Sequence, residues 1–312
     1  MNADGNDALK SPPRPTANVT LAPRRSRFIE LFRTTPPRTV CPNFHVLAHA
    51  NGCAFAPMCG YCYLKSSFWS RPTPRAYTNT EALLREARRW IRRDGLESYV
   101  LNTGNLSDSL AFEADRPLMA ALVELFRAEA EARGRPHTLL LVTKGGPAEC
   151  ASILELPSCA NVVVSFSVNH PEAAALHEPG AAPPADRLAA AATLREAGWR
   201  IRLRLDPMIA GYDYAETVSA VAAARAERVT LGTLRAEPGL LKISRDGLFS
   251  ALEPPAEPGG LARYAGDTRL ALYRPAVERL RPIGPVALCE EPVEMWDLLD
   301  LDREHILCNC CL

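Results

Sequence analysis

Residues 51–64 read Asn-Gly-Cys-Ala-Phe-Ala-Pro-Met-Cys-Gly-Tyr-Cys-Tyr-Leu. Three cysteines, Cys53, Cys59 and Cys62, fall within ten residues at Cys-x5-Cys-x2-Cys spacing. Glycine, proline and small residues between them disfavour a helix or a strand, so we expect a loop that can fold round a compact group. Thiolates this close together either bind a soft metal or are oxidised to one another. Three is an odd number for disulfides, which favours metal.

The loop fits more than one kind of metal site. Three cysteines leave one iron of a [4Fe–4S] cluster open to a small chelating ligand. A zinc site would need a fourth ligand, which His45, His49 or a distant cysteine could supply. Three buried thiols without any metal are a third interpretation. The spacing alone does not separate iron–sulfur from zinc.

The composition is that of an ordinary globular chain. Of the 312 residues, 47% are hydrophobic and 23% are charged, and 36 basic side chains balance 36 acidic ones. This zero net charge disfavours DNA as a partner but leaves it open. With no apolar run of about 18 residues and no secretion signal, we expect no membrane contact and a cytoplasmic location. Ten cysteines in a cytoplasmic chain indicate metal or thiol chemistry.

The hydrophobic pattern predicts an α/β fold. Short apolar runs alternate with amphipathic segments, which is typical of parallel strands covered by helices. Six such units predict a partial (β/α)6 barrel, although an open doubly wound sheet fits nearly as well. The predicted strands are 45–48, 99–101, 138–143, 161–168, 200–205 and 228–232. The predicted helices are 80–93, 116–133, 147–156, 185–197 and 214–226, with Thr80 as the N-cap of the first. Further predicted elements are a helix over 267–281 and a last strand over 284–288.

We expect three segments along the chain. Residues 1–40 are expected to form a disordered or loosely packed N-terminal arm, since their start is rich in polar residues and proline. Residues 41–235 are expected to form the barrel core. Residues 236–312 are expected to form a C-terminal extension whose cysteine-rich tail closes the barrel.

Polar residues follow the predicted strands, where ligands bind in parallel β/α folds. Gly104 would let the backbone approach a ligand closely, and Lys144 could bind a carboxylate. We expect these residues to gather on one rim. The residues on the five strand ends are Asn102 to Asn105, Thr143, Lys144, Ser165, Ser167, Asn169, Arg202, Arg204, Asp206, Thr233 and Arg235.

These stretches resemble the radical S-adenosylmethionine (SAM) enzymes and, among them, the spore photoproduct lyase group. Cys-Gly-Tyr-Cys-Tyr-Leu is similar to the cluster loop, although that family has Cys-x3-Cys-x2-Cys and this loop is two residues longer. Thr103-Gly104-Asn105 resembles the motif that holds the SAM amino group. The segments 142–144 and 165–167 are similar to those contacting the SAM carboxylate and ribose, and 231–235 resembles the strand-6 motif. The resemblance spans roughly residues 41–250.

The resemblance implies a [4Fe–4S] cluster on Cys53, Cys59 and Cys62, SAM as cofactor, and an electron donor such as a flavodoxin or a ferredoxin. Tyr61 and Tyr63 resemble the lyase tyrosines that relay a radical. The lyases carry a hydrogen-donating cysteine in a Cys-Thr-Ser-Asp stretch, whereas this chain has Asn105-Leu106-Ser107-Asp108. The candidate catalytic residues are Tyr61, Tyr63 and Asn105. The candidate SAM-binding residues are Thr103, Gly104, Asn105, Asp108, Lys144, Ser167, Asn169, Arg204 and Asp206.

The chain ends in Cys308-Asn309-Cys310-Cys311-Leu312. These three cysteines, with Cys289 as a further candidate, could hold trivalent arsenic, zinc or a second cluster, or be an inert tail. With Asn105 and the long cluster loop, they resemble the radical SAM enzyme of arsinothricin biosynthesis. The hypothesis is therefore transfer of the 3-amino-3-carboxypropyl group of SAM to arsenite, the favoured small-molecule substrate, for an antibiotic. Lyase-type DNA repair and a non-catalytic zinc protein are the alternatives.

Overall fold

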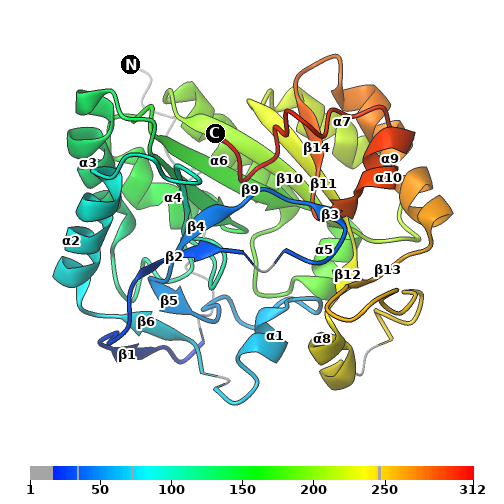
Figure 1. Ribbon diagram of the computed structural model, residues 1–312, viewed down its shortest axis with the longest axis horizontal. Helices are drawn as coiled ribbons and strands as arrows, with labels where there is room; N and C mark the ends of the chain where they lie inside the picture. Colours follow the sequence, from blue (N-terminus) through cyan, green and yellow to red (C-terminus); the bar gives the residue numbers. More distant parts are fainter. Residues whose placement is uncertain (1–16, 34, 72, 245–246) are drawn as a thin grey trace, which may run out of the picture.

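The computed structural model describes residues 17–33, 35–71, 73–244 and 247–312. Its centre is an eight-stranded sheet in the order β14-β11-β10-β9-β8-β7-β4-β2, in which only the β2–β4 pair is antiparallel (Figure 1). The strands are β2 (Ile29–Phe32), β4 (Phe44–Leu47), β7 (Val100–Asn102), β8 (Thr138–Thr143), β9 (Val162–Val168), β10 (Arg200–Met208), β11 (Arg228–Thr233) and β14 (Val286–Leu288). Within the described chain β14 and β2 remain the two edges, so the barrel is partial, as predicted.

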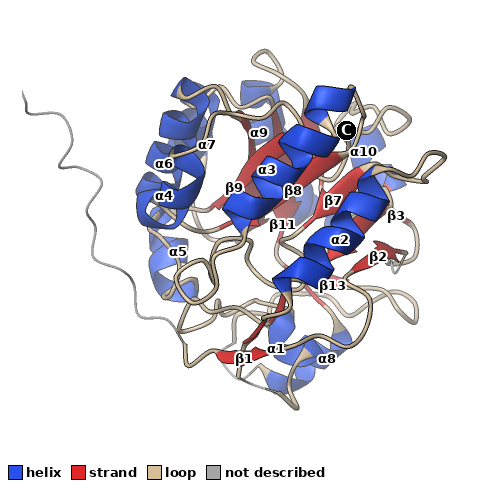
Figure 2. Cartoon of the chain, turned by 90° about the vertical axis from the view of Figure 1, so that its left-hand side faces the viewer, coloured by secondary structure: helices blue, strands red, loops and turns tan. Residues whose placement is uncertain are grey.

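Helices cover the outer face of this sheet (Figure 2). They are α2 (Thr80–Ile91), α3 (Met119–Glu129), α4 (Pro147–Leu154), α6 (Pro184–Glu196), α7 (Ala215–Ala223) and α9 (Gly266–Leu280). The main core lies between helices and sheet, whereas a smaller cluster that includes Val46, Leu140 and Val163 fills the inner face. Every residue of β9 is buried, because both faces of the parallel sheet are covered.

The predicted elements are present, with shifts at their ends. Helix α2 begins at Thr80, so that Asn79, not Thr80, is the N-cap. The predicted helix over 116–133 is α3 followed by the 3-10 turn η1 (Glu131–Arg133). It ends at Gly134, whose φ of 60° suits glycine. Sequence periodicity missed four short helices, α1 (Leu64–Ser67), α5 (Pro171–His177), α8 (Pro238–Ile243) and α10 (Val293–Leu298).

Part of the N-terminal segment is paired rather than loose. Residues 1–16 lie outside the described residues. Strand β1 (Thr20–Ala22) pairs with β6 (Arg75–Tyr77), and β2 pairs with β4 in the main sheet. Strands this short give little sequence signal, because their partners are distant in sequence. The small sheet β1-β6-β5, with β5 (Ala50–Asn51), flanks the start of the cysteine loop. The boundaries after residues 40 and 235 stay predictions.

The C-terminal extension adds two antiparallel pairs, β12 (Arg235–Ala236) with β13 (Ala262–Arg263), and β3 (Thr39–Val40) with β15 (Glu291–Pro292). The last residues then enter the barrel. Arg202 Nη1 donates to the carbonyls of Asn309 and Cys311 at 2.5 and 2.6 Å, and the Asn309 amide donates to Thr230 Oγ1 at 2.8 Å. These contacts lie on the first halves of β10 and β11, so the tail closes the barrel from the amino ends of its strands. Over the described residues, no helix is long and apolar enough to cross a membrane.

Candidate active site at the carboxyl ends of the strands

The three loop cysteines gather as predicted. The loop runs from β5 to α1 and contains no helix or longer strand. Burial raises the pKa of the Cys53 thiol, and the charges of Cys62 and Cys59 both raise it further, so the three thiols lie within electrostatic range of one another. Burial raises the pKa of Cys59 to about 12, against the lowering effect of the Lys144 ammonium. The loop thus presents three thiols beside the end of β8, where Lys144 follows the strand.

The surroundings of the loop do not favour a zinc ion. In the described part of the chain, no three His, Cys, Asp or Glu side chains converge on one metal-ion position. In a cluster the cysteines bind different irons, so their thiolates need not converge. Both ring nitrogens of His49 are engaged, Nε2 with Ser107 Oγ at 2.8 Å and Nδ1 with Arg116 Nη2 at 2.9 Å. His45 lies at the amino end of β4 and packs on Trp90.

The turn after β7 requires glycine at its centre. Thr103 is buried, and its Oγ1 lies 2.6 Å from Ser109 Oγ. Gly104 packs so tightly on β8 that a Cβ atom there would lie 2.5 Å from Val142 Cβ and 2.9 Å from the Val142 carbonyl oxygen. Asn102 Oδ1 accepts the Gly104 amide at 2.8 Å. The sequence predicted a glycine that lets the backbone approach a ligand, and that approach stays a prediction. The structure shows a different need for glycine, which is the close packing of the turn against β8.

We predict that Gly104→Ala lowers the free energy of unfolding by about 1–3 kcal/mol, because the added methyl overpacks the turn. Gly266→Ala is the matched control, since a Cβ there meets nothing within 4 Å. Its effect should stay within about 0.5 kcal/mol. Urea titrations of both variants measure the difference. Equal stabilities would contradict the packing described for Gly104.

Asp108 ties this turn to the end of β8. Its carboxylate accepts hydrogen bonds from the Lys144 amide at 2.7 Å, Thr143 Oγ1 at 2.8 Å and the Leu110 amide at 2.9 Å. Burial nevertheless raises the pKa of Asp108. These bonds position the turn, whereas a contact between Asp108 and SAM stays a prediction.

A buried carboxylate that sequence reasoning missed, Glu178, brings several predicted residues together. It pairs with Arg187 at 2.5 Å and with Lys144 at 3.8 Å, accepts Asn169 Nδ2 at 3.0 Å, and also accepts the Tyr61 hydroxyl. Although burial raises its pKa, Lys144 and Arg187 hold the pKa of Glu178 at about 2. Tyr61 and Lys144 therefore lie beside an ionised carboxylate, next to Cys59.

Ser167 and Asn169 are held by the protein around them. Arg187 Nη1 donates to the Ser167 carbonyl at 2.9 Å. Asn169 Oδ1 accepts the Tyr214 hydroxyl at 2.8 Å, while its amide nitrogen reaches Glu178. Both side chains are buried close to the Glu178 cluster. Their predicted contacts to SAM stay predictions.

Arg204 and Asp206 form a second charged group on β10. Asp206 accepts from Arg204 and from Arg235, the latter at 2.7 Å. Although burial raises it, Arg235 and Arg204 hold the pKa of Asp206 well below its usual range. Arg204 Nη2 and Arg235 Nη2 donate to Cys289 Sγ at 3.3 and 3.2 Å. Arg204 and Asp206, both predicted to contact SAM, are thus paired with each other, and Arg204 also contacts the Cys289 thiol that follows β14.

Tyr63 connects the cysteine loop with these residues. Its hydroxyl donates to the backbone carbonyl of Asn105 and lies within electrostatic reach of Cys62, Glu290 and Arg204. The Asn105 side chain, which stands at the lyase donor position, is half-buried. The predicted catalytic residues Tyr63 and Asn105 are therefore in contact, while Tyr61 points to the separate Glu178 cluster.

The tail cysteines lie close to one another, at the opposite end of the barrel from the cluster loop. Cys308 Sγ is 3.3 Å from Cys311 Sγ, and hydrogen bonds from Cys310 and Cys311 lower the pKa of Cys308 despite its burial. The hydrogen bond with Cys308 raises the pKa of Cys310. The Arg204 charge lowers the pKa of Cys310 and the Cys289 charge raises it, so Cys310 lies within electrostatic range of both groups. We call Cys308, Cys311, Cys310 and Cys289 the thiol ladder. Cys308 and Cys311 lie at the amino ends of the strands, Cys310 follows, and Cys289 lies at the carboxyl ends.

Comparisons of the sequence and of the structure with known proteins both match spore photoproduct lyases. The sequence model described as spore photoproduct lyase matches residues 40–231. No curated protein matches the chain. A spore photoproduct lyase complexed with dinucleoside spore photoproduct is 20% identical with a TM-score of 0.67, over 87% of this chain and 82% of that chain.

Two further solved structures carry SAM. A spore photoproduct lyase variant with bound AdoMet and dinucleoside spore photoproduct is 19% identical with a TM-score of 0.68, over 86% of this chain and 81% of that chain. SuiB from Streptococcus suis bound to S-adenosylmethionine is 12% identical with a TM-score of 0.50, over 81% of this chain and 53% of that chain. At these identities the structures show a shared fold, in agreement with the predicted partial barrel.

Proposed function

The chain belongs to the spore photoproduct lyase family of radical SAM enzymes, and from that premise we propose that it transfers the 3-amino-3-carboxypropyl group of SAM to arsenite. A radical SAM enzyme of this family uses a [4Fe–4S] cluster and SAM as cofactors. The proposal concerns the substrate and the fate of the SAM fragment. It rests on one observation, the thiol ladder inside the barrel.

The cluster loop has the donors that a cluster needs. Cys53, Cys59 and Cys62 would bind three irons and leave the fourth to SAM. Electron transfer from the bound cluster would split a carbon–sulfur bond of SAM. Lys144 lies 3.8 Å from Glu178 and over the Tyr61 ring, so its ammonium group would have donors left for the SAM carboxylate, and the Gly104 turn would let the backbone approach. These residues would hold and orient SAM.

The thiol ladder suits a soft, thiol-seeking substrate. Arsenic(III) binds up to three thiolates, and Cys308 already has two thiols within hydrogen-bonding distance. The lowered pKa of Cys308 favours the thiolate that would attack arsenite first. Because the tail enters from the amino ends of the strands, we propose that arsenic passes by thiol exchange from Cys308 through Cys310 to Cys289. Cys289 and Tyr63 both neighbour Arg204, which is one of the residues predicted to contact SAM, so Cys289 would be the thiol nearest to bound SAM.

The transfer balances with two electrons. One electron splits SAM into methylthioadenosine and an aminocarboxypropyl radical. Formation of the carbon–arsenic bond releases one thiolate ligand as a thiyl radical, which the second electron and a proton return to the thiol. Both electrons would come from an external one-electron reductant, for which a flavodoxin or a ferredoxin is the proposed class.

Lyase-type DNA repair is the second candidate, and the family match favours it. Tyr61 and Tyr63, which resemble the lyase tyrosines, are both present. However, Asn105 has no S–H bond from which a hydrogen atom could be taken, and it stands where the resemblance places the donor cysteine. Repair would therefore need a thiol from another position, such as Cys289.

The SAM-derived product separates the two candidates. With dithionite and SAM, we expect methylthioadenosine to form only when arsenite is added, measured by liquid chromatography. Thymine-dimer DNA without arsenite should give no SAM cleavage above background. Formation of 5′-deoxyadenosine that depends on this DNA would overturn the transferase proposal in favour of repair.

A further inference from the structure

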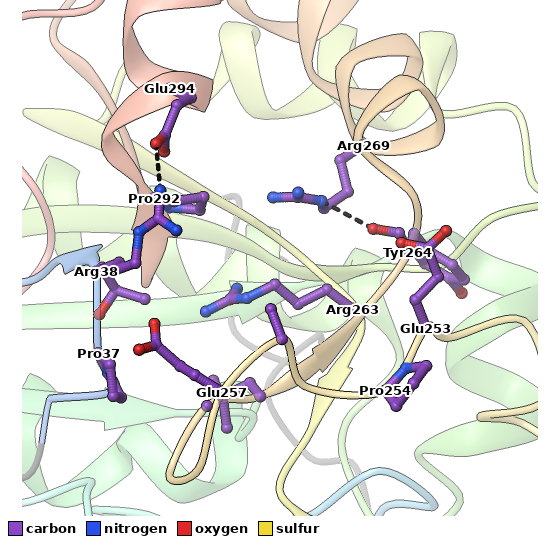
Figure 3. A pocket seen from close by; sticks show the side chains of 14 residues that line it. Pro37, Arg38, Glu253, Pro254, Glu257, Arg263, Tyr264, Arg269, Pro292 and Glu294 are labelled. Atoms are coloured by element: carbon purple, nitrogen blue, oxygen red, sulfur yellow. Dashed lines mark hydrogen bonds and ion pairs between the residues drawn. The ribbon is translucent and has the colours of Figure 1, made fainter.

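A cavity of about 240 Å³ lies on the C-terminal extension, away from the thiol ladder. Its walls come from β3, β13, β15 and the segment 253–261 (Figure 3). Three prolines and Leu261 give it an apolar side. Six charged side chains also line it: Arg38, Arg263, Arg269, Glu253, Glu257 and Glu294.

Two of the three arginines already have a carboxylate partner. Arg38 pairs with Glu294 at 2.7 Å, and Arg269 pairs with the buried Glu291. Arg263 differs, because neither terminal nitrogen of its guanidinium has a hydrogen-bond partner among the described residues. Both of these nitrogens are buried, and the whole side chain is only 13% exposed.

The nearest carboxylate cannot satisfy Arg263. Glu291 Oε1 is 4.0 Å from Arg263 Nη1, too far for a hydrogen bond, and it already accepts the Tyr273 hydroxyl at 2.8 Å. A buried guanidinium without partners is costly, which is why burial lowers the pKa of Arg263. Such a group calls for a partner that is not part of the protein. A carboxylate would match its paired donors.

The cavity also carries unpaired negative charge. Glu253 and Glu257 are exposed and form no ion pair within the described part of the chain. In Figure 3, the Glu257 and Arg263 side chains come from different segments and point toward one another. An anion alone would meet these two carboxylates, and a cation alone would meet Arg263. A ligand that carries both charges satisfies both sides.

We propose that this cavity binds a small zwitterionic α-amino acid with an apolar side chain. The ligand carboxylate binds Arg263, its ammonium group binds Glu257, and its side chain lies against the proline wall. The terminal nitrogens of Arg263 are closed off in the unliganded structure. Binding therefore requires the side chains around the Arg263 guanidinium to rearrange.

The proposed site is separate from the SAM site but shares its strands. Arg263 on β13 pairs in register with Arg235 on β12, and Arg235 binds Asp206 and Cys289. Glu291, which holds Arg269, is separated from Cys289 by one residue. An amino acid bound at Arg263 would thus contact the segments that position Cys289. This inference does not depend on arsenite or on SAM cleavage.

Calorimetry on the full-length protein tests the site with L-leucine, which fits the charge pattern and resembles neither adenosine nor arsenite. We expect saturable binding of one leucine, weakened about 10- to 100-fold by Arg263→Gln and by Glu257→Gln, the range for a lost hydrogen bond to a charged group. We expect the unvaried protein to bind 4-methylpentanoate and 3-methylbutylamine about 10- to 100-fold more weakly than leucine, because each of these compounds lacks one of the two charges. Arg281→Gln, outside the cavity, is the control and should bind leucine normally.

Three results would overturn the proposal. Absence of saturable heat with leucine at millimolar concentration would mean that water alone satisfies Arg263. Equal binding of 4-methylpentanoate and leucine would make the cavity a plain anion site. Unchanged leucine affinity in both variants would place binding elsewhere. Because Glu257 is exposed, the Glu257→Gln protein should fold normally, so the test does not depend on the stability of the Arg263 variant.

Discussion

The double variant Cys310→Ser, Cys311→Ser should lose arsenite-dependent formation of methylthioadenosine by about 100-fold or more, since even partners that only orient metal ligands are worth 10- to 100-fold. Two of the three tail thiols become hydroxyls, which bind soft arsenic poorly. The double variant should keep the brown colour and the iron content of the unvaried protein, because the tail lies at the other end of the barrel from the cluster loop.

Cys159→Ser is the matched control for the tail variant. Cys159 is a buried thiol just before β9 and is not one of the thiol-ladder cysteines. This control should keep its arsenite-dependent turnover. If the Cys310/Cys311 variant turns over as fast as the control, the tail is a structural plug and the thiol ladder has no part in the reaction.

Replacing one cluster cysteine should have a still broader effect. Cys59→Ala leaves two thiols in the loop, and we expect loss of the brown colour, of the iron and of all SAM cleavage, with or without arsenite. Metal analysis and optical absorbance after anaerobic reconstitution measure the first two. The alanine is small enough to fit without steric conflict, so the barrel itself should remain folded.

Cys150→Ala serves as the control for the loop, since Cys150 is a fully buried thiol on α4 outside it. It should retain the unvaried protein's iron content. A Cys59→Ala protein with unchanged iron would show that the cluster is held elsewhere. A colourless unvaried protein with stoichiometric zinc would instead support the non-catalytic zinc alternative.

The parts of the site that lie next to each other in sequence were predictable. Cys53, Cys59 and Cys62 share one loop, and Gly104 follows a short apolar strand, so spacing and strand-end position indicated both. The parallel strands were predictable as well, because runs such as Leu139 to Val142 are apolar on both faces. In each case a local pattern carries the information.

Residues that depend on tertiary contacts were not predictable. Glu178 follows a short helix with no motif around it, yet it joins Tyr61, Lys144 and Arg187. A charged residue after a helix is usually solvated, so sequence alone gives no reason to bury it. The tail is similar, because nothing in its cysteines tells from which end it enters the barrel. Arg202 was predicted to lie on the rim at the carboxyl end of its strand, and this was wrong, because Arg202 lies in the first half of β10 and donates to the carbonyls of the tail.

The central claim is that the carbon chain of SAM ends up on arsenic. Its most direct test is mass spectrometry of the arsenic-containing products after anaerobic turnover with SAM deuterated in the aminocarboxypropyl chain. We expect an arsenical that carries the labelled four-carbon amino acid chain, formed together with methylthioadenosine. Unchanged arsenite, with the label recovered in methionine beside 5′-deoxyadenosine, would contradict it.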